Sequence, residues 1–372
     1  MKKRILIATD NFLPRWDGIA RFLYEIIPKI GDSFEITVIC PEFPGEKIRF
    51  DNVRIYYFKP FLKVADISIA FPERNFVKSL VKESDIIFSQ TIGPIGARVV
   101  NMARKENKKI VAYVHSVEWE LFSKSIGGIM KNIIYRGTKI YAKSFYNKCN
   151  EIMVPSEEIA EIFDWMRIMP RKEIVHLGTN SGKFCPAVDK ALAKTKLNLP
   201  PDKLVIGYVG RIAREKDVLT LYHAFVRIRK EYQNAVLLII GNGLKELIDV
   251  MSKKNVIILP AQNDIVPYYQ AMDIFVQPSL TETTSLTVME AMSCGLPIVS
   301  TKVGFIKNYI VKDVNGMFFE KQNAYSLSTK LEILITNKDL REKLGKNARE
   351  TIVNHYQWEH TAQKIKKILL EL

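Results

Sequence analysis

The chain has few cysteines, and they lack the spacing that gives cysteine a structural role. Among 372 residues there are four, far apart in the sequence: Cys40, Cys149, Cys185 and Cys294. Because no C-x-x-C pair occurs, neither a zinc site nor a disulfide framework is indicated. This composition favours a reducing compartment, and we expect the protein in the cytoplasm.

Long apolar runs are also absent. No stretch approaches the roughly 18 apolar residues of a membrane-spanning helix. The N-terminal sequence MKKRILIATDNF has a basic pair, but the short apolar run after it predicts a buried first strand rather than a signal peptide. The length, with 47% hydrophobic and 26% charged residues, is typical of a globular protein of two domains.

Acidic residues are outnumbered by basic ones. The chain has 55 Lys and Arg against 40 Asp and Glu, a net charge of +15. This excess favours an anionic partner: nucleic acid, an acidic lipid surface or a phosphorylated substrate. No Asp-x-Asp pair that could hold magnesium against a diphosphate occurs, so we expect no metal cofactor.

Residues 274–303 are the most informative stretch. Ile274 to Gln277 is a short apolar run that predicts a buried strand, and the hydroxyl residues at 283–285 predict the start of a helix. Gly295, followed two residues later by Pro297, predicts the end of that helix. The next strand runs to Thr301. The loop before the helix therefore lies at the carboxyl edge of a parallel sheet, where open α/β folds bind ligands.

Two glutamates, Glu282 and Glu290, flank this helix start. The first turn of a helix presents unpaired amide groups and the positive end of the helix dipole, so it suits a phosphate. Carboxylates on either side suit the hydroxyl groups of a sugar and of a ribose. The alternative is one exposed carboxylate and one partner of the helix dipole. The whole string of residues favours a nucleotide-sugar site.

Two further units repeat the plan of strand, glycine loop and helix. In the one that begins at Leu204, Gly210 follows the strand, and Arg211 and Lys216 flank the loop. A guanidinium fork and an ammonium group in these places suit a diphosphate, although surface cations at a helix start are the alternative. The other unit opens the chain, with Gly18 between a strand and a helix.

The segment PSLTETTSLTVMEAMSCGLPIVST resembles the E-x7-E region of the retaining glycosyltransferases of family 4. The resemblance covers nearly the whole chain and is strongest from Leu204 to Thr301. It implies the GT-B fold, in which two α/β, Rossmann-like domains face a cleft and a C-terminal helix packs back on the first domain. The implied divisions are an acceptor-binding domain at 1–184, a nucleotide-sugar-binding domain at 185–353 and the returning helix at 354–372.

The same resemblance implies transfer of a sugar, with retention, from a nucleotide-diphosphate sugar to a hydroxyl acceptor. Glu282 is expected to orient the transferred sugar, Glu290 to hold the ribose, and His115, at the end of a predicted strand, to lie near the reacting carbon. Arg211 and Lys216 would stabilise the departing diphosphate. The other implied donor contacts are Gly18, Gly210, Ala261, Thr284, Ser285 and Leu286.

Three places depart from the family pattern. Thr284 and Ser285 stand where an aromatic-glycine pair is usual, and Asp217 stands where glycine is usual. Phe305 replaces the second glycine of a Gly-Gly-x-x-Glu element. Asp217 would weaken a neighbouring phosphate site unless its side chain turns away.

Residues 121–150 contain six Lys or Arg, no acidic residue and several aromatic ones. They predict an amphipathic helix, broken at Gly127-Gly128 and at Gly137, that can lie on an anionic membrane surface; a solvated basic face is the alternative. We expect a membrane lipid or lipid-linked acceptor, and a protein held peripherally at the inner face of the membrane. The basic residues assigned to this contact are Lys124, Lys131, Arg136, Lys139 and Lys143.

Three other functions stay open at this point. The acceptor could be soluble or a polysaccharide, and a nonhydrolysing sugar-nucleotide epimerase has the same fold. A nucleic-acid-binding protein would also explain the positive charge. No pattern of an OB or RNA-recognition fold occurs, so we expect no nucleic-acid partner.

Overall fold

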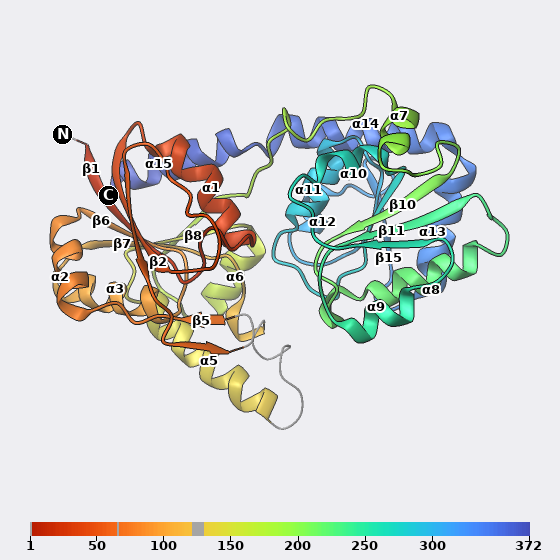
Figure 1. Ribbon diagram of the computed structural model, residues 1–372. Coiled ribbons are helices and arrows are strands. Elements are labelled where there is room, and N and C mark those ends of the chain that lie inside the picture. The colour runs from red at the N-terminus through yellow and green to blue at the C-terminus, as the bar shows by residue number, and fades with distance from the viewer. Residues whose placement is uncertain (1, 65–66, 121–129) are drawn as a thin grey trace. The chain divides into compact units, whose positions relative to one another are not determined.

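The computed structural model of the chain describes residues 2–64, 67–120 and 130–372 (Figure 1). It divides into two compact units. The first consists of Met1–Leu177 together with Trp358–Leu372, and the second of Gly178–Gln357. In this division the expected boundaries after residues 184 and 353 both fall within the second unit.

The first unit contains a parallel sheet of seven strands in the order β3-β2-β1-β6-β7-β8-β9. Its central strands are continuous apolar runs, as expected for a parallel sheet that is covered on both faces. A separate antiparallel pair is formed by β4 (Leu62–Val64) and β5 (Ile67–Ile69). The strands of the main sheet are β1 (Lys3–Ala8), β2 (Phe34–Pro41), β3 (Val53–Phe58), β6 (Ile86–Ser89), β7 (Lys109–Tyr113), β8 (Glu151–Val154) and β9 (Arg171–Ile174).

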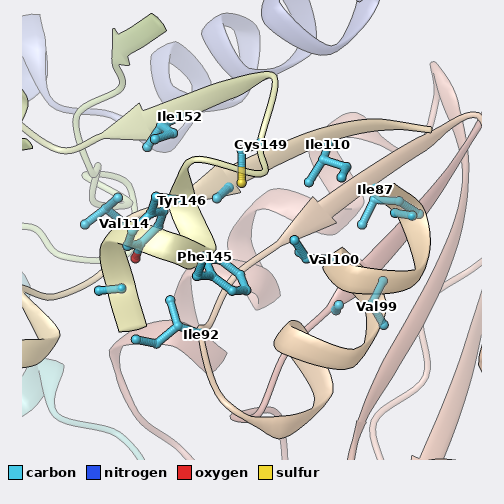
Figure 2. Close-up of a cluster of buried hydrophobic side chains, with 14 of the residues drawn as sticks. Ile87, Ile92, Val99, Val100, Ile110, Val114, Phe145, Tyr146, Cys149 and Ile152 are labelled. Atoms are coloured by element: carbon cyan, nitrogen blue, oxygen red, sulfur yellow. The ribbon is translucent and has the colours of Figure 1, made fainter. Parts of the chain in front are cut away.

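Helices bury their apolar faces against this sheet. Figure 2 shows part of the resulting core, where Val99 and Val100 of one helix and Phe145 of another pack over strand residues such as Ile87 and Ile110. The helices of this unit are α1 (Gly18–Ile30), α2 (Arg74–Glu83), α3 (Pro94–Lys105), α5 (Met130–Tyr146), α6 (Glu157–Trp165) and α15 (Trp358–Glu371).

Helix α5 runs without interruption through Gly137, so the predicted break there is wrong. The break predicted at Gly127-Gly128 lies outside the described residues. A single glycine costs a helix only about 1 kcal/mol relative to alanine. The C-terminal half of α5 is held by the buried side chains of Ala142, Phe145 and Tyr146, which offset that cost.

Helix α15 packs on the first unit, as predicted for the C-terminal helix. The Trp358 ring is buried against Phe22 of α1, with 6.2 Å between the ring centroids. The Lys29 ammonium of α1 lies 2.6 Å from the Glu359 carboxylate. The chain end therefore belongs to the fold of the first unit.

The second unit contains a parallel sheet of six strands in the order β12-β11-β10-β13-β14-β15. These are β10 (Leu204–Val209), β11 (Ala235–Ile240), β12 (Val256–Leu259), β13 (Ile274–Gln277), β14 (Ile298–Thr301) and β15 (Gly316–Phe319). Its helical elements are α7 (Lys190–Lys196), the 3-10 turn η1 (Arg214–Lys216), α8 (Val218–Ile228), α9 (Lys245–Met251), α10 (Val266–Ala271), α11 (Leu286–Ser293), α12 (Ile306–Tyr309), α13 (Ala324–Thr336) and α14 (Lys338–His355).

Both sheets reverse their strand order beside the first strand of the unit. The reversal lies between β1 and β6 in the first unit and between β10 and β13 in the second. In open parallel sheets, ligands bind outside the carboxyl ends of the strands at such a switch point. Among the helices described, none is long and apolar enough to cross a membrane.

Candidate active site

In the second unit, the loops that follow β10 and β13 are tied to each other at the switch point. The backbone N–H of Leu280 donates to the carbonyl of Glu215 at 2.9 Å. On the far side, the Phe305 N–H donates to the Thr283 carbonyl at 2.9 Å. Gly304 is required there, because its φ is +48° and a Cβ would lie 2.0 Å from the Glu282 carbonyl oxygen.

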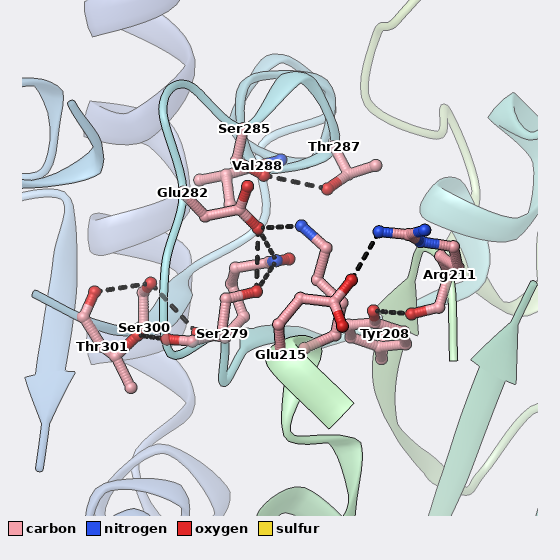
Figure 3. Close-up of polar contacts among 12 residues, drawn as sticks. Tyr208, Arg211, Glu215, Ser279, Glu282, Ser285, Thr287, Val288, Ser300 and Thr301 are labelled. Atoms are coloured by element: carbon pink, nitrogen blue, oxygen red, sulfur yellow. Dashed lines mark hydrogen bonds and ion pairs between the residues drawn. The ribbon is translucent and has the colours of Figure 1, made fainter. Parts of the chain in front are cut away.

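The Glu282 carboxylate is the centre of a polar network at this point (Figure 3). Its Oε1 accepts from the Lys216 ammonium at 2.6 Å. The same oxygen accepts from Gln277 Nε2 at 2.9 Å and from Ser279 Oγ at 2.8 Å. The side chains of Lys216 and Glu282 are 21% and 9% exposed, so the ion pair is only partly screened by water. Lys216 and Glu282, predicted for the same site, therefore lie together.

Arg211 lies on the solvent side of the same loop. Its guanidinium pairs with the Glu215 carboxylate, and its carbonyl accepts from the Tyr208 hydroxyl at 2.8 Å. More than half of the Arg211 side chain is exposed, and exposed ion pairs are weak. The guanidinium can therefore leave Glu215 for a better anionic partner.

The backbone of the loop explains two of its residues. Gly210 has φ +152°, a conformation that side chains rarely adopt, and a Cβ there would lie 2.8 Å from the Tyr208 hydroxyl. Asp217 has φ +48° and ψ +40°, in the left-handed region that glycine adopts most easily and aspartate tolerates. Its carboxylate accepts from the Thr220 hydroxyl at 2.7 Å, at the start of α8. Burial raises the Asp217 pKa.

The start of α11 is formed by the two residues that depart from the family pattern. Ser285 is the N-cap, and its hydroxyl accepts from the Val288 N–H at 3.4 Å. The Thr284 hydroxyl oxygen is buried and has no hydrogen-bond partner among the residues that the structure describes. Leu286 is the first helical residue. This helix start thus carries a neutral cap and an unpaired hydroxyl.

Glu290, which the resemblance assigns to the ribose, is buried. It is 1% exposed, within α11, and its Oε2 accepts from the Tyr269 hydroxyl at 2.7 Å. Ala261, also predicted as a donor contact, is exposed, and its N–H donates to the Asn242 side chain at 3.1 Å.

The switch point of the first unit is built differently. The Asp10 carboxylate, just after β1, accepts from the Thr91 hydroxyl at 2.6 Å and from the Ile95 and Gly96 N–H groups at 2.9 and 3.3 Å, at the start of α3. The Asp17 carboxylate accepts from the N–H groups that follow Gly18, at the start of α1. Burial raises the pKa of both carboxyl groups.

His115 follows β7 and contacts the side chain of Gln90, which follows β6. His115 Nε2 and Gln90 Oε1 are 3.0 Å apart. The imidazole packs against the rings of Phe22 and Tyr113, and burial lowers its pKa to about 3. His115 is therefore a neutral group at the edge of the first sheet.

The basic residues predicted to contact a membrane are only partly within the described structure. Lys124 lies outside the described residues, and Lys131 lies near the start of α5. Arg136 is exposed, whereas Lys139 and Lys143 are partly buried. The Lys139 ammonium lies over the rings of Tyr135 and Trp165, at 5.7 and 5.8 Å from their centroids.

Sequence reasoning missed the residues that support these groups: Asp10, Gln90, Gln277 and Ser279. Each is a polar residue at or just after the carboxyl end of an apolar strand. That position is the signal by which they could have been found. In the described part of the chain, no three His, Cys, Asp or Glu side chains gather closely enough to hold a metal ion.

Comparisons with known proteins identify the family and the fold. The family model of glycosyl transferases group 1 matches residues 189–351, and that of glycosyltransferase family 4 matches residues 16–181. The sucrose-phosphate synthase of Thermosynechococcus elongatus has a similar structure, with a TM-score of 0.81, 18% identity and coverage of 100% of this chain and 99% of that one.

Two curated relatives align along nearly their whole length. The UDP-Gal:alpha-D-GlcNAc-diphosphoundecaprenol alpha-1,3-galactosyltransferase of Escherichia coli is 26% identical, over 99% of this chain and 97% of its own. The alpha-monoglucosyldiacylglycerol synthase of Acholeplasma laidlawii is also 26% identical, with the same coverage.

The chain belongs to glycosyltransferase family 4 and has the GT-B fold. It is a retaining glycosyltransferase that transfers a sugar from a nucleotide sugar. The predicted family, fold class and type of enzyme are thereby confirmed.

Proposed function

We propose that the protein transfers a hexose from a uridine-diphosphate sugar to a hydroxyl group of a membrane lipid or lipid-linked molecule, at the inner face of the cytoplasmic membrane. The main observation that supports a donor site is the ion pair between Lys216 and Glu282 at the switch point of the second unit. A uridine donor is supported by the E. coli relative, whose name specifies UDP-Gal.

In this proposal the cations of the second unit stabilise the leaving diphosphate. Negative charge on the diphosphate grows as its bond to the anomeric carbon breaks, so preorganised positive groups lower the barrier. Lys216 supplies an ammonium group and Arg211 a guanidinium. The start of α11, at Thr284 to Leu286, supplies the positive end of a helix dipole and the unpaired Thr284 hydroxyl. No metal ion is required.

Glu282 orients the transferred sugar without repelling the diphosphate. Its carboxylate is already neutralised by Lys216 and accepts from Gln277 and Ser279, which leaves its second oxygen to bind a sugar hydroxyl. Glu290 and Ala261 are assigned to the ribose and the base. Because Glu290 is buried and accepts a hydrogen bond from Tyr269, its contact with the ribose requires a donor that reaches α11.

Retention follows if the acceptor attacks from the face that the diphosphate leaves. The bond between the anomeric carbon and the diphosphate oxygen breaks, and the acceptor oxygen bonds to that carbon on the same face. The acceptor proton passes to the departing diphosphate oxygen. His115, which is neutral, offers a polar but uncharged contact beside the reacting sugar.

The lipid acceptor is supported by α5. Ile133 and Ile140 on this helix are 60% and 72% exposed, and basic residues follow along the same helix. Exposed apolar side chains among cations suit an anionic membrane surface. The two curated relatives carry lipid acceptors in their names, a diphosphoundecaprenol and a diacylglycerol.

A pocket of about 540 Å³ in the first unit adds to this support. It lies between α3 and α5, and the aromatic side chains of Phe71 and Tyr141 line it together with Ile92 and Pro94. Arg98 also lines it, with its guanidinium 5.4 Å from the centroid of the Phe71 ring. An apolar pocket with a cation suits the chain and the polar head of an amphiphilic acceptor.

The test has two parts. A screen of nucleotide sugars, scored by release of nucleoside diphosphate with lipid and soluble acceptors, should give turnover with a uridine donor and a lipid acceptor. Vesicle sedimentation should show binding that requires anionic lipid and falls with salt.

Replacement of Lys131, Lys139 and Lys143 by Glu should abolish that binding. The matched control replaces three exposed lysines of α14 by Glu: Lys338, Lys343 and Lys346. Efficient turnover of a soluble acceptor without vesicle binding would instead make α5 a solvated face.

A further inference from the structure

Gln90 occupies the switch point of the first unit, directly after the buried strand β6. Its backbone N–H donates to the carbonyl of Ala8, at the end of β1, at 2.8 Å. The residue is 2% exposed. Both its backbone and its side chain are therefore fixed at the place in a parallel sheet where ligands bind.

The contact between Gln90 and His115 determines where the imidazole carries its proton. The Gln90 amide is placed with Oε1 toward His115 Nε2, at 3.0 Å, and because a carbonyl oxygen only accepts, this orientation makes His115 Nε2 the donor. A neutral imidazole carries one proton, which leaves a lone pair on Nδ1. The rings of Phe22 and Tyr113, with centroids at 4.9 and 4.6 Å, hold the plane of the imidazole.

The amide nitrogen of Gln90 has no hydrogen-bond partner among the described residues, although it is buried. Buried donors in proteins are nearly always paired, because an unpaired one loses its bonds to water without replacement. The unpaired Gln90 amide lies at the edge of the sheet where ligands bind. Its lack of a protein partner is explained if a bound ligand supplies the hydrogen-bond acceptor. The amide is uncharged, so it suits a hydroxyl or ether oxygen of a sugar rather than a phosphate.

We propose that Gln90 has two parts in the reaction: its carbonyl holds His115 in the Nε2-protonated tautomer, and its amide N–H binds an oxygen of the transferred sugar or of the acceptor. The inference rests on the proposed function, since that places the reacting sugar beside His115. Gln90 is then a positioning residue for His115 and a binding residue for the substrate.

Two substitutions separate these parts. Gln90→Met has nearly the same volume and removes both the carbonyl and the amide. Gln90→Glu keeps an acceptor for His115 and removes the amide donor. Gln363→Met is the matched control, because Gln363 is exposed on α15 of the same unit.

The first measurement is the nitrogen-proton NMR correlation spectrum of the histidine rings in the free protein, with His115 assigned by its loss in a His115→Gln variant. The wild type and Gln90→Glu should show His115 protonated at Nε2. Gln90→Met should show a mixture of the two tautomers, and the control should match the wild type. Because no substrate is present, this result does not depend on the proposed donor or acceptor.

The second measurement is kcat/KM for sugar transfer. Loss of one hydrogen bond to the substrate should lower it about tenfold in Gln90→Glu, with a larger loss in Gln90→Met. The proposal is overturned by a wild-type ring protonated at Nδ1, or by rates within about twofold of wild type in both variants. If Gln90→Met does not fold, the wild-type spectrum and the kcat/KM of Gln90→Glu still test the proposal.

Discussion

The two units have the same sheet topology at their switch points, but they carry different chemistry there. In the first unit, the Asp10 and Asp17 carboxylates accept from the amide groups at the starts of α3 and α1. In the second, α11 is capped by the neutral hydroxyl of Ser285, and Lys216 and Arg211 stand nearby in the loop after β10.

This difference supports our proposal that the second unit receives the anionic part of the donor. A helix start attracts an anion through its free amide groups and its dipole. Where a carboxylate of the protein already accepts from those amides, a phosphate would meet a like charge. The first unit is therefore suited to neutral hydroxyl groups and the second to the diphosphate.

The largest expected effect is the loss of a cation from the second unit. Lys216→Ala and Arg211→Ala should each lower the single-turnover rate about 10²- to 10³-fold, because a preorganised charge at the leaving group is lost. Arg214→Ala is the control: Arg214 lies in the same loop, is mostly exposed and pairs with Glu246. A rate for Lys216→Ala within about threefold of wild type would show that Lys216 does not stabilise the leaving diphosphate, and the proposed difference between the two units would fail.

A smaller effect is expected at Glu290. Glu290→Gln should weaken donor binding about tenfold and change kcat little, because a contact with the ribose is made equally in the ground and transition states. Tyr269→Phe, which removes the hydroxyl bonded to Glu290, is the companion variant. A fall in kcat with unchanged donor affinity would assign Glu290 to the reacting centre instead.

Gly18→Ala tests how close the donor comes to the first unit. A Cβ at Gly18 would meet no atom within 4 Å, so the variant should fold as stably as the wild type in thermal unfolding. If the diphosphate approaches this backbone, donor affinity should fall less than in Lys216→Ala, by up to about tenfold. A loss as large as that of Lys216→Ala would show that both switch points bind the anion.

The smallest effect is expected for metal removal. Activity should be unchanged by EDTA, because in the proposed site Lys216 and Arg211 neutralise the diphosphate. The check is the rate of diphosphate release before and after chelation. Complete loss on chelation, restored by Mg²⁺ or Mn²⁺, would show that these cations are insufficient.

The local signals of the sequence predicted much of the second unit. Each of these signals depends on only a few neighbouring residues. The apolar run at Ile274 predicts β13, the hydroxyls before Leu286 predict the start of α11, and Gly295, which has a left-handed backbone, predicts its end. Lys216 and Glu282 lie far apart in the sequence, and only the family pattern assigns them to one site; no sequence signal predicts their ion pair.

The first unit was harder to predict because its contacts depend on strand order. Asp10 meets the start of α3, and Gln90 meets His115, only because β1, β6 and β7 are neighbours in the sheet. No spacing of residues along the chain encodes these pairs. The continuity of α5 through Gly137 likewise depends on packing against the rest of the unit.

We infer that the second unit binds the diphosphate through Lys216. Isothermal titration of UDP into the wild type, Lys216→Ala, Arg214→Ala and Gly18→Ala tests it most directly. UDP should bind the wild type saturably, with nearly unchanged affinity for Arg214→Ala and at least about tenfold weaker affinity for Lys216→Ala, as expected for loss of a charged hydrogen bond to phosphate. Equal affinity in the wild type and Lys216→Ala would contradict it.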